Sequence, residues 1–554
     1  MNGPGPSRTS PPRDRVVAGA PALPPSAAAC AGALAPLRWP IFRALWIGAL
    51  ASNVGTWVHE VGAAWLMATL TASPTLIALV QAAATLPIFL LALLGGALAD
   101  VVDRRRLLLV TQGWMMVTSA ALGFLTNAGL TNAGVLLAGT FALGLGTALN
   151  GPAWQAIVPE LVPREQMAAA LTLNGVGINM ARAAGPALGG FVVGTLGPGS
   201  AFLLNAVSFL GVMLVLFGWD RPPRRSLLPG ETLLGAVQAG LRYARYAPDL
   251  RAVLVRSGVF IVGGSALWAL LPVLVRYDLG LGPSEYGLLL GALGAGAVGG
   301  AFLLPSLRRL LSTGGQVTVA GLLMGGVLLL LAVLPGPGGI ALALAGGGAA
   351  WIAILTAFHT GAQASLAPWV RGRGMAVYLL VFFGGLAGGS ALWGGVAEHL
   401  GTRPAFACAA VAVIAGILAT SRLPLPAGTA PIIAASRHWP AAAIAAEADA
   451  ERGPVLVTVE YRIDPADAEA FARAMSAVRI IRMRDAAIRW DLLTDPTDPG
   501  RYIESFLVES WIEHLRQHER ITAADRDIEQ RARRFHAGPT PPLVSHFIAK
   551  DLPG

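Results

Sequence analysis

Two ionisable side chains lie inside long apolar stretches of the sequence, where a charge is costly and usually serves a function. Glu60 shares one helical face with Asn53 and Trp57, because the three residues fall at positions i, i+4 and i+7. A carboxyl group shielded from water suits the uptake and release of protons. Arg182 lies in another apolar stretch and can hold an anion or pair with Glu60. The alternatives are that Glu60 is solvated or paired near a helix end and that Arg182 only binds helix-end carbonyl groups.

Two glutamines, Gln155 and Gln363, occupy corresponding positions in the similar segments QAIVPELVPREQMA and QASLAPWVRGRGMA. They are candidates for lining the same site, although one polar side chain per helix is also an ordinary contact between membrane helices. Glu398 and His399 end another apolar stretch, and we expect them to be solvated. We find no constellation typical of a catalytic centre, and we expect neither an enzyme nor a bound metal or cofactor.

The apolar stretches set the class of protein. Of the 554 residues, 55% are hydrophobic and only 13% are charged, whereas soluble globular proteins carry about 25% charged residues. A membrane-spanning helix needs about 20 mostly apolar residues, and we count twelve such segments. They are residues 41–70, 74–98, 106–128, 133–159, 166–195, 199–219, 250–276, 283–306, 315–335, 338–366, 371–399 and 403–420.

The net charge of +9 comes almost entirely from arginines, which interrupt the apolar stretches. Arginines follow the even-numbered spans, for example Arg308 and Arg309 after span 8. Only Arg276 and Arg403 follow odd-numbered spans. Positive loops stay on the cytoplasmic side, so we expect a multi-pass protein of the bacterial inner membrane with both termini in the cytoplasm. The arginines form no basic surface with stacking aromatic residues, which argues against nucleic-acid binding.

The membrane part consists of two similar halves. The segment GGALADVVDRRRL (95–107) aligns with GGAFLLPSLRRLL (299–311), and GPALGG (185–190) aligns with GSALWG (389–394). We therefore predict an all-α membrane protein of two six-helix halves in parallel duplication. The expected regions are a disordered cytoplasmic tail (1–36), the first half (37–219), a cytoplasmic segment (220–249), the second half (250–424), a linker (425–453) and a soluble domain (454–554).

The segment GGALADVVDRRR resembles the loop signature G-x-L-A-D-x-x-D-R-R-R, which lies between spans 2 and 3 of the major facilitator superfamily. Gly96, Asp100, Asp103, Arg104 and Arg105 match this signature. The resemblance implies a cytoplasmic gate of carboxylate–guanidinium pairs that break and reform. The alternative is a charge cluster that only fixes the topology.

A second segment, GVGINMARAAGPALGG (175–190), resembles the antiporter motif of the same superfamily through Gly185, Pro186, Gly189 and Gly190. Proline bends the helix and the glycines permit close packing. In the superfamily this motif goes with exporters, although glycine-rich packing alone looks similar.

Longer stretches, among them GPAWQAIVPELVP and RGMAVYLLVFFGGLAGGSALWG, resemble the enterobactin-exporter-like branch, called transmembrane secretion effectors. This resemblance implies export of small amphipathic molecules, such as siderophores, antibiotics or drugs, driven by proton entry. Two alternatives stay open: an uptake permease, and a membrane-tethered monooxygenase that acts through its C-terminal domain.

The soluble domain is expected to have the order βαββαβ, which is typical of a ferredoxin-like α+β domain. Its predicted strands are 455–463, 488–495, 501–510 and 543–551, with one long helix over 511–535. The domain resembles antibiotic-biosynthesis-monooxygenase-like dimeric barrels, which implies self-association. His514 and His518 lie at i and i+4 and form a possible metal pair, but without a third ligand we favour solvated or dimer-contact histidines.

Overall fold

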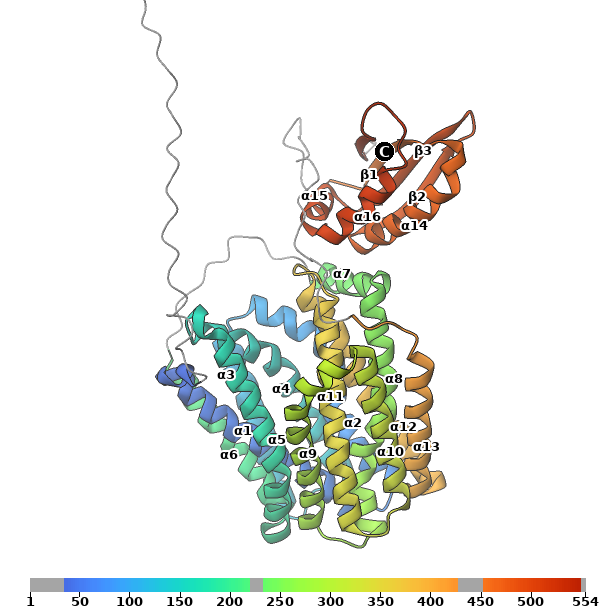
Figure 1. The fold of residues 1–554 in the computed structure, drawn as a ribbon. Coiled ribbons are helices and arrows are strands. Elements are labelled where there is room, and N and C mark those ends of the chain that lie inside the picture. The colour runs from blue at the N-terminus through green and yellow to red at the C-terminus, as the bar shows by residue number, and fades with distance from the viewer. Residues whose placement is uncertain (1–33, 220–232, 427–451, 550–554) are drawn as a thin grey trace, which may run out of the picture.

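A computed structural model describes residues 34–219, 233–426 and 452–549. Nearly all of the predicted tail and most of the predicted linker lie outside these residues. The described part consists of a helical bundle, a helix that lies across one end of it, and a small α+β domain beyond that helix (Figure 1).

Twelve long helices of the described part form the bundle, six in each half. Eleven of them are long and apolar enough to cross a membrane, and Asn53, His59 and Glu60 interrupt the apolar sequence of the twelfth, α1. The predicted two-half helical fold is confirmed. The helices are α1 (Pro40–Leu70), α2 (Pro74–Val101), α3 (Arg104–Asn127), α4 (Ala133–Ile157), α5 (Met167–Leu196), α6 (Pro198–Phe217), α8 (Pro248–Val273), α9 (Pro283–Leu310), α10 (Thr313–Val333), α11 (Pro337–Ala364), α12 (Arg371–Leu400) and α13 (Thr402–Thr420).

The two halves meet reciprocally, because the second helix of each half packs against the fifth helix of the other. These pairs are α2 with α12 and α5 with α9. The two fifth helices, α5 and α12, each have 30 residues. Each ends at a glycine with positive φ, Gly197 or Gly401, where other residues would be strained. The same local geometry at both sites supports the predicted duplication.

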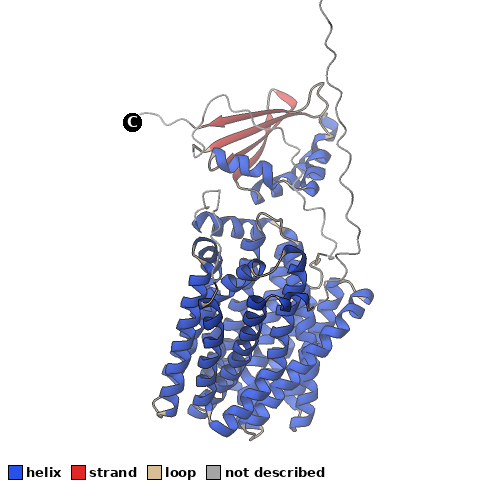
Figure 2. Cartoon of the chain, turned by 90° about the vertical axis from the view of Figure 1, so that its left-hand side faces the viewer, coloured by secondary structure: helices blue, strands red, loops and turns tan. Residues whose placement is uncertain are grey.

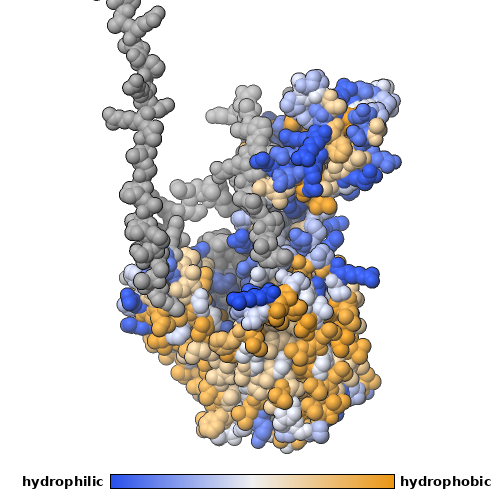
Figure 3. All heavy atoms as spheres, viewed as in Figure 1, coloured by the Kyte–Doolittle hydropathy of each residue, from blue (hydrophilic) through white to orange (hydrophobic). Residues whose placement is uncertain are grey.

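The surface of the bundle is apolar along its length, whereas polar residues gather at the end near α7 and over the small domain (Figure 3). The exposed apolar side chains include Phe124, Phe191 and Phe302. Soluble proteins rarely expose an apolar surface of this extent, and such a surface fits the hydrocarbon layer of a membrane.

Helix α7 (Leu233–Tyr246) lies in the predicted segment between the halves and was missed from the sequence. Ala239, Tyr243 and Ala244 are buried on one of its faces, while Leu241 and Arg245 are exposed. The hydroxyl of Tyr243 donates a hydrogen bond to the carbonyl oxygen of Ser365 at 3.0 Å, between α11 and α12. This bond ties α7 to the second half.

The C-terminal domain has its four strands in the predicted places of the order βαββαβ, but two helices, α15 and α16, stand where one was predicted. Its antiparallel sheet has the strand order β2-β3-β1-β4, and its helices cover the sheet face that looks toward the bundle (Figure 2). The predicted long helix is wrong, because it breaks after Arg520: the side chain of Thr522 caps a new helix and accepts a hydrogen bond from the Asp525 N–H. The elements are β1 (Val455–Arg462), α14 (Ala468–Arg484), β2 (Ala487–Asp495), β3 (Asp498–Val508), α15 (Trp511–Arg520), α16 (Ala523–Arg533) and β4 (Leu543–Ile548).

This domain contacts α7 and the segment just before α12 through arginine side chains. The Arg520 guanidinium lies 4.4 Å from the ring centre of Trp369, and the Arg484 guanidinium lies 5.6 Å from that of Tyr243. Arg242 of α7 pairs with Glu513 of α15 at 3.8 Å. Guanidinium groups over aromatic rings give favourable contacts without full loss of hydration. Helix α7 therefore makes two of these three contacts with the domain.

Candidate functional site

A cavity of about 340 Å³ lies between the two halves of the bundle. Both halves contribute to it: α1, α2, α4 and α5 from the first, and α8, α9, α11 and α12 from the second. A cavity at the interface of two repeats is the usual position of a transporter's substrate site. Its polar lining includes Thr56, His59, Glu60, Gln81, Thr85, Thr140, Thr147 and Arg182, and its aromatic lining includes Trp57, Trp268, Tyr286, Trp351, Phe382 and Phe383.

Glu60 and Arg182 both line this cavity, as the sequence analysis anticipated for a pair on different helices. The side chain of Glu60 lies deep in the bundle and is exposed to the cavity, and that of Arg182 is half-buried. The two side chains come from different helices of the first half, α1 and α5. A carboxylate and a guanidinium facing one enclosed space can exchange partners when a proton or an anion enters.

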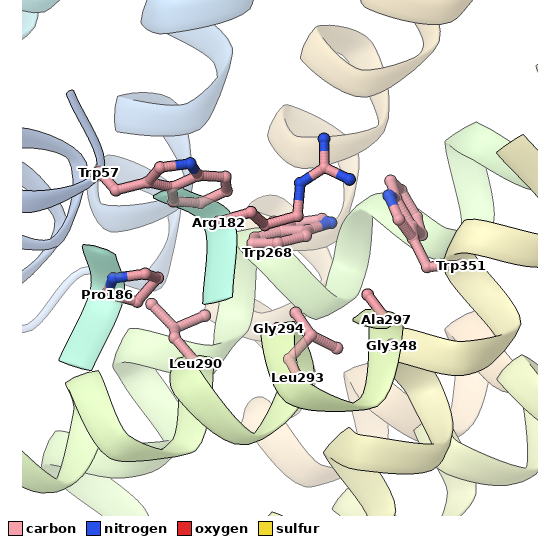
Figure 4. Close-up of a pocket in the computed structure, with 10 residues that line it drawn as sticks. All are labelled: Trp57, Arg182, Pro186, Trp268, Leu290, Leu293, Gly294, Ala297, Gly348 and Trp351. Carbon is pink, nitrogen blue, oxygen red and sulfur yellow. The ribbon is translucent and has the colours of Figure 1, made fainter. Parts of the chain in front are cut away.

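Three tryptophans surround Arg182 (Figure 4). The ring centres of Trp57 and Trp268 are 6.1 Å apart, and those of Trp268 and Trp351 are 5.8 Å apart. The rings come from α1, α8 and α11, so each half contributes to this group. Aromatic faces around one cation can bind the apolar body of a molecule while the guanidinium binds an acidic group.

The other predicted polar residues lie elsewhere. The amide of Asn53 donates to the carbonyl oxygen of Ala49 in its own helix at 2.8 Å. Gln155 is exposed, and the Gln363 amide lies 3.0 Å from His359 Nε2 one helical turn away. None of the three is among the residues described as lining the cavity. Their predicted roles in coupling stay predictions.

The predicted gate segment connects α2 to α3. Asp103 caps α3, and its Oδ1 accepts a hydrogen bond from the Arg106 N–H at 2.9 Å. Arg104 pairs with Glu160 at 2.7 Å and donates to the carbonyl oxygen of Ala156, while Arg105 donates to the carbonyl oxygen of Leu216 at 2.7 Å. The surroundings of Gly96 and the side chain of Asp100 lie outside the described part. Arg104 thus forms an ion pair with Glu160, a carboxylate that the sequence analysis did not single out.

The predicted antiporter motif forms close helix contacts. A Cβ atom on Gly185 would lie 2.5 Å from Cβ of Trp57, and one on Gly190 would lie 2.7 Å from Cα of Gly287. Any side chain at either position would push apart α5 and its neighbours α1 and α9. Gly189 packs against Val58 in the same way, and Pro186 lies beside Arg182 in the lining shown in Figure 4.

The two histidines of the possible metal pair have different surroundings, and His518 is partly exposed. His514 is buried, with only 1% of its surface exposed, so it is not solvated. Its Nε2 lies 3.3 Å from Nε2 of His518, and its ring centre is 4.7 Å from that of His546. Among the described residues no group of three or more His, Cys, Asp and Glu side chains is arranged to hold a metal ion. Burial, together with the neighbouring His518 and His546, lowers the pKa of His514 to about 3.

This buried histidine makes the stability of the domain fall in acid. Between pH 6.5 and about 3 the unfolded chain binds a proton at His514 that the folded domain excludes, so the domain loses about 1.4 kcal/mol per pH unit. We expect hydrogen exchange of β1 and β3 in the purified full chain, corrected for intrinsic rates, to quicken as pH drops from 7.5 to 5. His514→Phe should weaken this dependence, whereas His399→Ala should leave it unchanged; equal dependence in both variants would contradict the assignment.

Comparison with known proteins decides the family. The sequence profile of transmembrane secretion effectors matches residues 31–553. The chain belongs to this family. The match extends over the bundle and over the C-terminal domain.

Several curated proteins are similar to this secretion effector. It is 25% identical to the staphyloferrin A transporter of Staphylococcus aureus over 285 residues, which cover 50% of this chain and 70% of that protein. It is 27% identical to the multidrug efflux pump Tap of Mycolicibacterium fortuitum, covering 54% of this chain and 74% of Tap. It is 26% identical to the enterobactin exporter EntS of Shigella boydii, covering 51% and 69%.

Solved structures confirm the fold. A bacterial homologue of the lysosomal transporter Spinster superposes with a TM-score of 0.56 at 14% identity, covering 70% of this chain and 98% of that one. A bacterial homologue of the iron transporter ferroportin gives a TM-score of 0.53 at 15% identity, covering 69% and 97%. The secretion effector is therefore a major facilitator transporter that resembles siderophore and drug exporters, and it is not an enzyme.

Proposed function

We propose that this transporter exports small amphipathic molecules of the siderophore, antibiotic or drug class in exchange for protons. The observation that carries the proposal is the single cavity that Glu60, Arg182 and three tryptophans share. The tryptophans suit the apolar part of a substrate, Arg182 suits an acidic group, and Glu60 is the proton carrier. Proton entry would then discharge Glu60 and change the pairing of Arg182, which couples the two movements.

The proposed orientation places the α7 face of the bundle in the cytoplasm of a bacterium, together with both termini. Arg242, Arg245, Arg371 and Arg373 lie in α7 or at the start of α12 on this face, as the positive-inside rule requires of a cytoplasmic surface. Protons would enter from outside while the substrate leaves.

The test of export compares metabolites in cells and medium between the parent bacterium and a strain that lacks this chain. We expect the substrate to accumulate in the mutant cells and to disappear from the medium. A compound that accumulates only in the medium would instead make the chain an uptake permease. A change confined to the oxidation state of one compound would assign the function to the C-terminal domain.

Self-association through the C-terminal domain is also part of the proposal. The sheet face that points away from the bundle carries Leu456, Leu493, Leu543 and Phe547, which are 37%, 51%, 65% and 56% exposed. A second copy of the domain would cover this apolar face. Native mass spectrometry should show dimers that Phe547→Glu dissociates. The exposed-charge control Glu469→Gln on α14 should not; dimers that persist in Phe547→Glu would exclude this face.

A further inference from the structure

The end of the bundle opposite α7, here called the distal face, is held shut by contacts between the two halves. Oε2 of Glu398 in α12 accepts hydrogen bonds from Oγ of Ser73 at 2.7 Å and from the N–H of Thr75 at 3.1 Å. Thr75 lies in the first turn of α2, where N–H groups lack partners within the helix. A carboxylate of one half therefore caps a helix of the other, with a favourable helix dipole.

A second contact joins α1 to the end of α8. Here Tyr277 lies in a π-helical turn, Leu274–Asp278, that continues α8. Its hydroxyl lies 2.7 Å from the carbonyl oxygen of Ala68 and 2.9 Å from that of Thr71, and it can donate to either. The neighbouring Arg276 guanidinium lies 5.4 Å from the ring centre of Trp65. The last turn of α1 is thus held by two consecutive residues of the second half.

A third contact between the halves is made by α5 and α9, which touch at the distal face and are farther apart nearer α7. The backbones touch at Gly190 and Gly287, and again at Arg182 and Gly294. Gly175 of α5 and Ala301 of α9 lie two helical turns closer to α7, on the same helix faces as Arg182 and Gly294. A Cβ atom on Gly175 would meet no atom within 4 Å, and Ala301 is exposed. The structure therefore has a closed distal face, whereas α5 and α9 are not in contact at these two positions nearer α7.

We propose that Glu398 and Tyr277 form a latch that sets the equilibrium between this state and one open at the distal face. A transporter that opens to each side in turn must break its contacts on the closed side. The Glu398 and Tyr277 contacts can break without loss of any helix, because each joins a helix end of one half to a side chain of the other. The latch requires only that the chain alternates between two openings, and it is independent of the proton and of the direction of transport.

The experiment measures access to the cavity instead of transport. The chain has two cysteines, Cys30 and Cys408, which are changed to serine, and a single cysteine is introduced by Gln81→Cys in the cavity lining. A membrane-impermeant methanethiosulfonate reagent is then applied to whole cells and, separately, to inverted membrane vesicles. We expect Glu398→Ala and Tyr277→Phe each to raise labelling from the distal side roughly tenfold, the effect of losing one strong hydrogen bond, and to lower labelling from the α7 side.

Two further variants make the result decisive. Glu285 also lies at the distal face, but its carboxylate bonds to the Gly282 N–H of its own half, so Glu285→Ala should leave both labelling rates unchanged. Gly190→Val drives a side chain into the Gly287 backbone and should open the distal face whether or not the latch exists. If Gly190→Val raises distal labelling while Glu398→Ala and Tyr277→Phe behave like Glu285→Ala, the latch is wrong.

Discussion

Glu60→Gln is expected to abolish transport driven by a pH gradient while the protein still folds, inserts and binds its substrate. Glutamine keeps the size and one carbonyl oxygen of the side chain but cannot take up a proton near neutral pH. A gradient of one pH unit stores about 1.4 kcal/mol per proton, enough for roughly a tenfold concentration ratio of a substrate exchanged one for one. In proteoliposomes that ratio should fall to about one in the variant.

Exchange of labelled for unlabelled substrate separates coupling from binding. This exchange needs no net proton movement, so Glu60→Gln should retain it. Glu60→Asp should keep part of the pH-driven transport, and Glu165→Gln, at an exposed carboxylate between α4 and α5, should keep all of it. Unimpaired accumulation in Glu60→Gln would remove this residue from the mechanism.

The sequence predicted the fold well because membrane helices follow simple rules. Length, hydropathy and the position of arginines define the spans and their direction, and the resemblance of residues 95–107 to 299–311 and of 185–190 to 389–394 indicated the duplication. Helix α7 was missed because it is short and amphipathic, with no apolar run to mark it. The break at Ile521–Thr522 was missed because a capping box at Thr522 was read as the middle of one helix.

The candidate site was predicted only in part. A charge in an apolar span is visible in a sequence, and Glu60 and Arg182 do face one cavity. Trp268 and Trp351 have no such signal, since an aromatic residue in an apolar span is as common against lipid as in a cavity. Contacts between the halves are the hardest to predict: Glu398 is exposed, as expected, but it also bonds to Ser73 and Thr75, which lie more than 300 residues earlier.

Arg182 and Glu60 should behave as one energetic unit in a double-mutant cycle. Both charges face one cavity of limited hydration, so removing either leaves the other less well compensated, and Arg182→Gln and Glu60→Gln should each lower the stability of the purified protein. If the two charges act on each other across the cavity, the double variant should be less destabilised than the sum of the two, with a coupling of about 0.5–3 kcal/mol. Chemical denaturation in detergent gives the four free energies of unfolding.

The same four proteins also test what Arg182 binds. If its guanidinium holds an acidic group of the substrate, Arg182→Gln should weaken binding of anionic compounds by roughly tenfold or more, the value of a charge-assisted hydrogen bond, and leave binding of neutral analogues nearly unchanged. Arg403→Gln is the matched control, because that arginine bonds to the carbonyl oxygens of Ala332 and Leu334 at the distal face. Two results together would mean that Arg182 only supports the helices: additive free energies of unfolding, and an equal loss of affinity for anionic and neutral compounds. Proton coupling would then have to pass from Glu60 to the substrate without Arg182.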